Sequence, residues 1–200
     1  VGGGDVCEVG EVGGRRGRGG GRWEGEYPAG VFEYASDLVT DMRETRPQIK
    51  VYGAGYPEKH PQAETLDENI DNLKRKVDAG VTHLISQLFY DNADFYRFLD
   101  KARAAGIDVP IEAGIMPVTN AKSVRRMSST CEARVPEPVE TMLQRWGENH
   151  ATLREAGIAY ASQQVADLVA HGVDGVHLYT MNHPAVTRRI WNNVSGLFTD

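Results

Sequence analysis

Two short apolar runs flank one amphipathic stretch in the segment 49–91. The first run, Val51–Tyr56, ends at a cluster with two prolines, and proline cannot extend a buried strand because it lacks the N–H donor. Over Leu66–Ala79, apolar residues recur at offsets of three and four, which is the spacing of one helix face. The second run, Val81–Tyr90, is apolar on both faces apart from Gln87, as in a strand that is covered on both sides. The order of strand, helix and strand predicts a βαβ unit.

The same alternation continues to the end of the chain. Gly80, Gly106 and Gly172 each precede a β-branched residue, as glycines that end helices in the left-handed conformation do. Ser36 and Asn120 are the predicted N-caps of their helices. Further helices are predicted over Ser36–Arg46, Asp94–Ala105, Asn120–Ser129, Ala151–Ala170 and Ala185–Val194, a short one within Cys131–Glu148, and further strands over Val109–Met116 and Val173–Thr180.

Four strands that alternate with helices predict an α/β protein with a parallel sheet. A closed (β/α)8 barrel needs eight strands and about 250 residues. The pattern therefore predicts either half of such a barrel or a small open α/β sheet.

Residues 1–30 do not share this pattern. They contain 12 of the 22 glycines and a basic run that includes Arg15, Arg16 and Arg18. Because so few apolar side chains cannot offset the entropy of ordering, we expect a disordered Gly/Arg-rich leader that does not open a barrel strand, followed by one domain over 31–200. An RNA-binding arginine–glycine tract is the less favoured interpretation.

Composition excludes several classes of function. A net charge of −6 and a pI near 5.5 argue against a general nucleic-acid binder. No apolar run approaches the ~20 residues of a membrane span. Cys7 and Cys131 do not form a disulfide framework, which favours the cytoplasm. The histidines are scattered, and no Cys-x-x-Cys or His-x-x-x-His pair predicts a metal site.

Polar side chains follow the predicted strands, at the sheet edge where parallel α/β proteins bind ligands. Aromatic rings and amides such as Tyr56 and Gln87 suit a flat ligand that forms hydrogen bonds. Arg75 and Lys76, on the helix that follows His60, could reach a diphosphate. The structural alternatives are a core amide at Gln87, a turn cap at His60 and a solvated helix face at the two basic residues.

Six motifs in order resemble methylenetetrahydrofolate reductase over residues 32–198. They are Tyr34-Ala35-Ser36-Asp37-Leu38-Val39, Gly55-Tyr56-Pro57-Glu58-Lys59-His60-Pro61, Asn72-Leu73-Lys74-Arg75-Lys76-Val77-Asp78-Ala79-Gly80, Ser86-Gln87-Leu88-Phe89-Tyr90-Asp91, Gly114-Ile115-Met116-Pro117-Val118 and His177-Leu178-Tyr179-Thr180-Met181-Asn182. The resemblance implies a partial (β/α)8 TIM barrel made of about the last four βα units of a family that holds FAD.

The resemblance also implies site residues and chemistry. FAD contacts fall on Tyr34, Ala35, Tyr56, His60, Ala63, Asn69, Asn72, Arg75 and Lys76. Contacts with folate or nicotinamide fall on Gln87, Ser123, Met127 and His183. The implied reaction is FAD-dependent reduction of 5,10-methylenetetrahydrofolate to 5-methyltetrahydrofolate, with NADH or NADPH as co-substrate. The family resemblance further implies a homo-oligomer.

One family feature is missing. The general acid of the family is a Glu in a Glu-Phe-Phe-Pro-type motif, and this sequence has no such motif, so no catalytic residue is assigned. We therefore expect an N-terminally truncated chain. The alternatives are a non-catalytic remnant that binds flavin or pairs with another half-barrel, and a small α/β protein with a phosphate-ligand site. Open edges at the strands near 49 and 173 predict self-association of the isolated chain.

Overall fold

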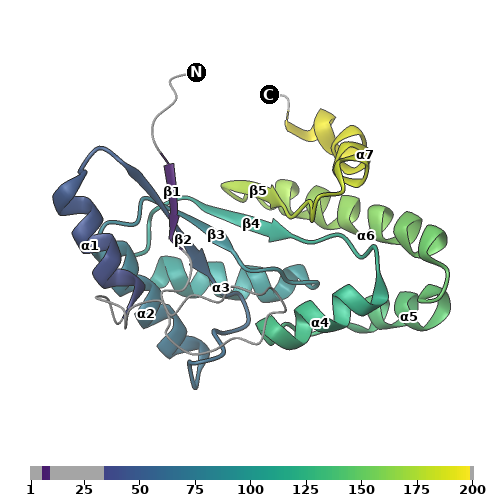
Figure 1. Cartoon of the computed structure of the whole chain (residues 1–200), viewed down its shortest axis with the longest axis horizontal. Helices are drawn as coiled ribbons and strands as arrows, with labels where there is room; N and C mark the ends of the chain where they lie inside the picture. The colour runs from purple at the N-terminus through teal and green to yellow at the C-terminus, as the bar shows by residue number, and fades with distance from the viewer. Residues whose placement is uncertain (1–5, 10–33, 199–200) are drawn as a thin grey trace, which may run out of the picture.

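The computed structural model describes residues 6–9 and 34–198 (Figure 1). Five strands pair in parallel and in chain order, so each strand lies next to the one that follows it in the sequence. The strands are β1 (Val6–Val9), β2 (Lys50–Gly55), β3 (His83–Ser86), β4 (Ile111–Ile115) and β5 (Gly175–Leu178).

Helices connect the strands from β2 onward, and two further helices lie between β4 and β5. They are α1 (Ala35–Thr45), α2 (Leu66–Asp78), α3 (Asn92–Ala104), α4 (Ala121–Cys131), α5 (Glu137–Trp146), α6 (His150–Ala170) and α7 (Pro184–Val194), followed by the 3-10 turn η1 (Ser195–Phe198).

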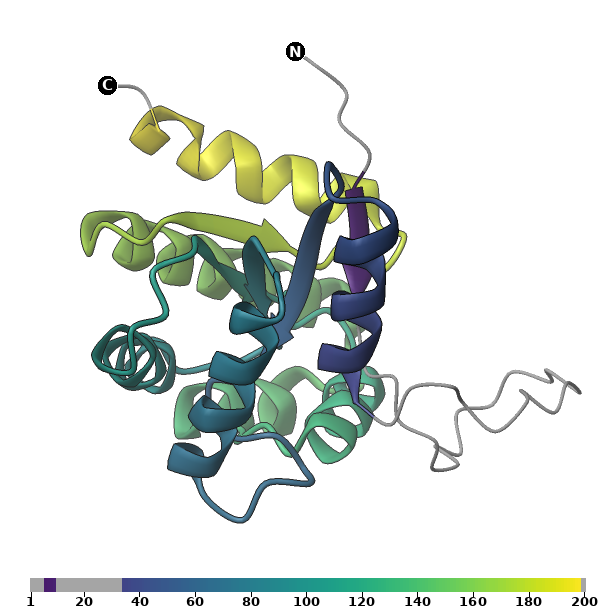
Figure 2. The same cartoon turned by 90° about the vertical axis from the view of Figure 1, so that its left-hand side faces the viewer.

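The strand order distinguishes a barrel segment from a doubly wound sheet. In a doubly wound sheet the order reverses at a switch point, whereas here the strands follow one another from β1 to β5. The helices wrap around the outside of a curved sheet (Figure 2). This arrangement is an α/β fold of the partial (β/α)8 barrel type, as expected.

The main core lies between the sheet and its helices. Along β2, buried residues such as Val51 alternate with half-buried ones such as Tyr52, so only one face of the strand packs against helices. Phe95 and Phe98 on α3 and Ile190 on α7 are fully buried in this core. A second cluster, which includes Leu88, Val118, Leu143 and Leu153, joins α4, α5 and α6 beyond the carboxyl ends of the strands.

Glycine conformations agree with the predicted helix ends. Gly80, Gly106 and Gly172 have φ values of 124°, 72° and 70°, which L-residues with a side chain rarely adopt. Asn120 caps α4, because its side-chain oxygen accepts a hydrogen bond from Ser123 N at 2.9 Å. These predictions are confirmed.

Three predictions about local structure were wrong. The second apolar run forms a strand only over His83–Ser86, because its later residues leave the ladder and enter the second core cluster. The N-cap of α1 is Tyr34 rather than Ser36, and the Asp37 carboxylate accepts the Tyr34 N–H at 2.9 Å.

The third correction concerns the leader. Val6–Val9 form β1, which pairs in parallel with β2 and covers the edge that was expected to be open. Backbone pairing needs no particular side chain, so the glycine-rich composition hid this strand. The other residues of the segment 1–30, and its predicted disorder, lie outside the described residues.

Candidate functional site

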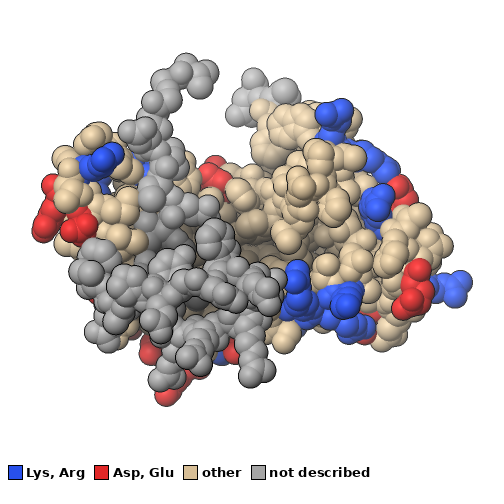
Figure 3. Space-filling model, viewed as in Figure 1, with Lys and Arg blue, Asp and Glu red and all other residues tan. Residues whose placement is uncertain are grey.

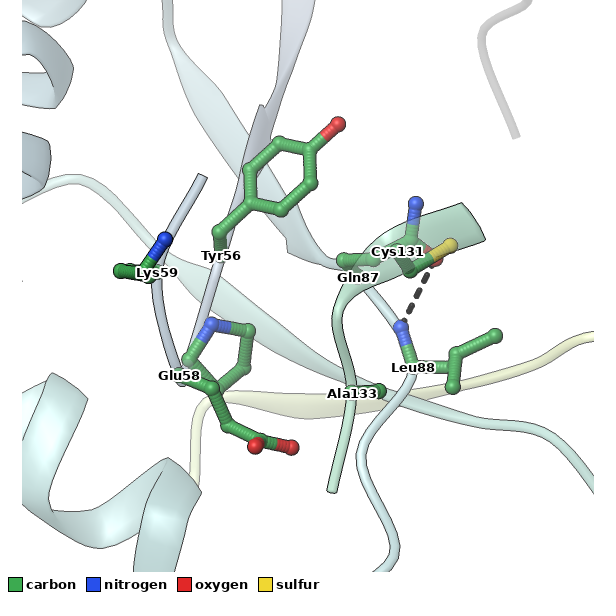
Figure 4. Close-up of a pocket in the computed structure, with 8 residues that line it drawn as sticks. Tyr56, Glu58, Lys59, Gln87, Leu88, Cys131 and Ala133 are labelled. Carbon is green, nitrogen blue, oxygen red and sulfur yellow. Dashed lines mark hydrogen bonds between the residues drawn. The ribbon is translucent and has the colours of Figure 1, made fainter. Parts of the chain in front are cut away.

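A small cavity lies at the carboxyl ends of β2 and β3, where the sequence predicted a ligand site (Figure 4). The cavity volume is about 10 Å³, and the cavity is lined by Tyr56, Pro57, Glu58, Lys59, Gln87, Leu88, Cys131 and Ala133. Tyr56 and Gln87, which were proposed from the sequence, therefore face one common cavity. The cavity is smaller than the roughly 300 Å³ at which small-molecule sites usually begin.

The loop between β2 and α2 is held by a buried amide. Asn69 is 5% exposed; its Nδ2 donates to Tyr56 O at 3.0 Å, and its Oδ1 accepts from His60 N at 3.2 Å. The rings of Tyr56 and His60 meet edge to face with centroids 4.6 Å apart. His60 Nδ1 accepts from Gln62 N at 3.0 Å, and His60 O accepts from Ala63 N at 2.9 Å. The structure thus brings Tyr56, His60, Ala63 and Asn69 together.

Gln87 follows β3 directly and is held through its backbone. Gln87 N donates to Gly55 O at 2.6 Å, which fixes it beside the end of β2. The side-chain Oε1 accepts from Leu88 N at 2.9 Å, as the dashed line in Figure 4 shows. Gln87 is half-buried at the cavity wall rather than a fully buried core amide.

The three proposed residues of the second half of α2 differ in exposure. Lys76 is half-buried, and its Nζ donates to Ala54 O in β2 at 3.0 Å. Arg75 is exposed and Asn72 is half-buried, three residues apart on the same helix. Residues at this spacing are neighbours on a helix surface, so an amide and a guanidinium are offered to the same side.

The other proposed residues do not line the cavity. Tyr34 is 61% exposed at the start of α1, and Ala35 packs against the main core. Ser123 lies in the first turn of α4, and Met127 packs against the second core cluster. His183 is exposed at the N-terminus of α7, where its N–H donates to Thr180 O at 2.8 Å.

A second, open groove of about 400 Å³ lies beyond the end of β5. It is lined by Thr180, Asn182, Pro184, Thr187, Arg188 and Trp191. Lys and Arg side chains also gather on the face that contains α4 (Figure 3), where Lys122, Arg125 and Arg126 are exposed. No helix among residues 34–198 is long and apolar enough to cross a membrane.

Sequence reasoning missed the connection between α4 and α5. Cys131, the last residue of α4, and Ala133 in the connection line the cavity opposite the end of β2. Both Glu58 carboxylate oxygens accept from Arg134 N, at 2.9 and 2.8 Å. Pro136 and Pro138 indicated a loop here, but partners more than 70 residues apart in the sequence leave no pattern.

The carboxyl groups around this connection differ in their pKa. Burial raises the pKa of Glu58 above its ordinary value of 4.5, and the hydrogen bond from Arg134 N only partly opposes this effect. The hydrogen bond from the Arg134 guanidinium lowers the pKa of Asp91 below 3.8. Both carboxylate oxygens of Glu58 thus accept from the backbone of the connection between α4 and α5.

Comparison with known proteins places this chain in a family. The sequence model described as methylenetetrahydrofolate reductase matches residues 14–195. The 5,10-methylenetetrahydrofolate reductase of Escherichia coli K12 is 36% identical over 169 residues, which cover 83% of this chain and 57% of that protein. Methylenetetrahydrofolate reductase (NADH) 1 of Arabidopsis thaliana is 35% identical over 163 residues, or 76% of this chain and 28% of that protein.

The fold is also found in a solved structure. A protein from Clostridium thermocellum, described as binding two copies of 5-methyl-5,6,7,8-tetrahydrofolic acid, superposes with a TM-score of 0.60 at 14% identity, over 85% of this chain and 61% of that one. The chain spans only 28% and 57% of the length of the two curated relatives above. Because the family model matches most of its residues, the chain belongs to the methylenetetrahydrofolate reductase family.

Proposed function

We propose that this chain takes part in FAD-dependent reduction of 5,10-methylenetetrahydrofolate to 5-methyltetrahydrofolate, with NADH or NADPH as the hydride source, in the cytoplasm and as part of a homo-oligomer. The observation that carries the proposal is the shared cavity of Tyr56 and Gln87 at the carboxyl ends of adjacent strands. Family membership supports the reaction class.

The donors of α2 and the loop before it fit an anionic dinucleotide. Arg75 and Asn72 offer a guanidinium and an amide from one helix surface, which suit phosphate oxygens. Lys76 places an ammonium group next to the end of β2. Tyr56 and His60 offer ring surfaces near the cavity, while Asn69 and Ala63 keep their loop in place. When bound, FAD would supply the hydride chemistry, and these residues would bind and orient it.

Gln87 is the proposed contact for the folate pterin and the nicotinamide, which would occupy the same face in turn. Its amide can both donate and accept, so it can pair with the edge of either heterocycle. Ser123, Met127 and His183 are proposed to contact the same ligands from α4 and from the end of β5. No residue of this chain is proposed as the proton donor.

The visible spectrum of the purified chain tests this proposal. We expect a yellow protein whose flavin band bleaches when NADH or NADPH is added. Arg75→Ala should weaken FAD binding by about 10- to 150-fold, because a charged hydrogen bond is worth roughly 1.5–3 kcal/mol. Lys122→Ala, on the exposed side of α4, is the matched control and should bind FAD as the parent does. A colourless chain that binds no added FAD would contradict the proposal.

A second candidate is a flavin-binding chain without catalysis, which pairs with another half-barrel. It is favoured by β5, an edge strand in which all four residues are half-buried. A yellow protein that does not bleach with either nicotinamide cofactor would support this alternative.

A further inference from the structure

The connection between α4 and α5, residues 132–136, lies along one side of the cavity, and we call it the strap. Polar contacts of four residue pairs attach it to the loops that follow β2 and β3 and to the first turn of α3. Lys59 Nζ pairs with Glu132 Oε2 at 2.9 Å, and Arg134 N donates to both oxygens of Glu58. The Arg134 guanidinium donates to Asp91 Oδ2 at 2.7 Å and to Asp94 Oδ2 at 2.9 Å. Arg134 therefore connects two separate loops through its backbone and its side chain.

The wall that carries Gln87 is fixed by the sheet, and the loop that carries Tyr56 is held by the buried side chain of Asn69. Gln87 N is bonded to Gly55 O, and the hydroxyl of Tyr179 donates to Ser86 O at 2.9 Å. The strap has no strand pairing, and it begins at Glu132, which is strained at φ 52°. A cavity of about 10 Å³ must widen before a planar ring system can enter. Ala133 and Val135 pack against the second core cluster, and otherwise the polar contacts of Glu132 and Arg134 hold the strap, so the strap is the wall that we test for movement.

The charge on Asp94 strengthens this attachment. The Asp94 side chain is only 6% exposed, so its ionised carboxylate needs partners. Arg97 and Arg134 both donate to it, and Arg134 comes from the strap. Lifting the strap would leave this buried carboxylate with one guanidinium fewer.

We infer that Arg134 and Glu58 are positioning residues that hold the strap against the cavity, and that release of these contacts opens the cavity to its ligand. The identity of that ligand, a planar ring of the flavin or pterin class, rests on the proposed function. The attachment of the strap does not rest on the proposed function, because it can be measured without any ligand.

Cys131 reports the position of the strap. It is 9% exposed, lines the cavity and lies directly before the strap. The experiment measures the rate at which iodoacetamide alkylates Cys131 in the full chain, with peptide mapping to separate it from Cys7. Arg134→Ala and Glu58→Ala should each raise the rate by about tenfold, because each removes hydrogen bonds to a charged group and so favours local opening.

Two matched variants separate strap release from general loosening. Arg125→Ala also removes an ion pair between α4 and α5, with Glu140 at 3.0 Å, but Arg125 is not in the strap, so the rate should stay within about twofold. Glu58→Gln keeps an oxygen that accepts the Arg134 N–H and should largely restore the slow rate. The urea midpoint of each variant shows whether the fold is intact.

Unchanged alkylation in both Arg134→Ala and Glu58→Ala would overturn the inference, and so would an equal rise in Arg125→Ala. If Arg134→Ala does not fold because Asp94 loses a partner, Glu58→Ala and Glu58→Gln decide the question alone. A chain that binds no FAD would contradict the proposed function and leave these rates interpretable.

Discussion

Single residues set how closely the elements of this chain approach. Gly157 lies in α6 where a Cβ would overlap the carbonyl oxygen of Val118, and Gly114 lies in β4 where a Cβ would overlap Ser86 O. Both glycines are therefore needed for close packing rather than for an unusual φ. The sequence showed neither requirement, because the contacting residues come from other elements.

Gly157→Ala tests this close approach. In an ordinary helix interior, alanine is more favourable than glycine by roughly 0.8–1 kcal/mol. Here we expect the opposite sign, a loss of about 1–3 kcal/mol, because the added methyl group overpacks the contact with Val118. Urea unfolding measures the difference. Gly196→Ala is the control, since its Cβ would meet nothing within 4 Å, and an equal effect of both changes would contradict the explanation.

Two asparagines of α2 should separate structure from binding. Asn69→Ala removes both hydrogen bonds that hold the loop of Tyr56 and His60, and we expect a loss of about 1–3 kcal/mol in the free energy of unfolding. Asn72→Ala, one turn later and half-buried, should leave stability nearly unchanged and weaken FAD binding. Thermal unfolding and FAD titration of both variants check this. If Asn72→Ala lost stability and Asn69→Ala lost only FAD binding, the two proposed roles would be contradicted.

At the scale of elements, α3 and α6 are joined by a polar network that has no counterpart in the sequence pattern. The Asp167 carboxylate accepts from Asn92 Nδ2 at 2.8 Å and from the Tyr96 hydroxyl at 2.6 Å. The ring of His171 lies 4.5 Å from that of Tyr96, and its Nδ1 lies 3.5 Å from Asp167 Oδ1. These side chains fix how the two helices meet outside the apolar core.

This network should make stability depend on pH at the acid end. The hydrogen bonds from Asn92 and Tyr96 lower the pKa of Asp167 below 3.8. The contribution of Asp167 to the free energy of unfolding is therefore present above pH 3.8 and is lost as the pH falls through the lower pKa of the folded state. The difference in unfolding free energy between the parent and Asp167→Asn should therefore shrink in that range. Urea titrations at a series of pH values measure it, and a difference that does not change with pH would contradict the assignment.

At the scale of the whole molecule, the sheet is an open segment. The edge of β2 is covered by β1, but β5 remains an edge strand. Large apolar side chains are exposed near it on the elements that follow: Met181 (50%), Trp191 (51%), Leu197 (48%) and Phe198 (45%). Trp191 and Phe198 stack with centroids 5.7 Å apart, so the apolar surface is continuous there.

We expect the purified chain to self-associate through this surface, because open edges and exposed apolar patches favour association. Trp191→Glu should shift light-scattering mass toward the monomer at equal concentration. Tyr34→Ser removes an aromatic ring that is even more exposed, at 61%, from the N-cap of α1, toward the opposite edge of the sheet, and should not change the mass. A monodisperse parent that melts cooperatively as a monomer would refute this expectation.

The sequence alone was sufficient to predict the alternation of helices and strands, the glycines that end helices and the family of the chain. These depend on local periodicity and on short motifs, both of which are present in consecutive residues. It also predicted that Tyr56 and Gln87 would lie at one edge of the sheet, because parallel strands place their carboxyl ends together.

Only the tertiary structure decided what surrounds these two residues. Arg134 contacts Asp91 and Asp94 from a connection 43 and 40 residues later in the sequence. In the same way, β1 pairs with β2 although a long segment of the chain separates them. Such contacts depend on how elements pack in space, and no periodicity or spacing along the chain records them. For the same reason, the close contact between Gly157 of α6 and Val118 could be seen only in the tertiary structure.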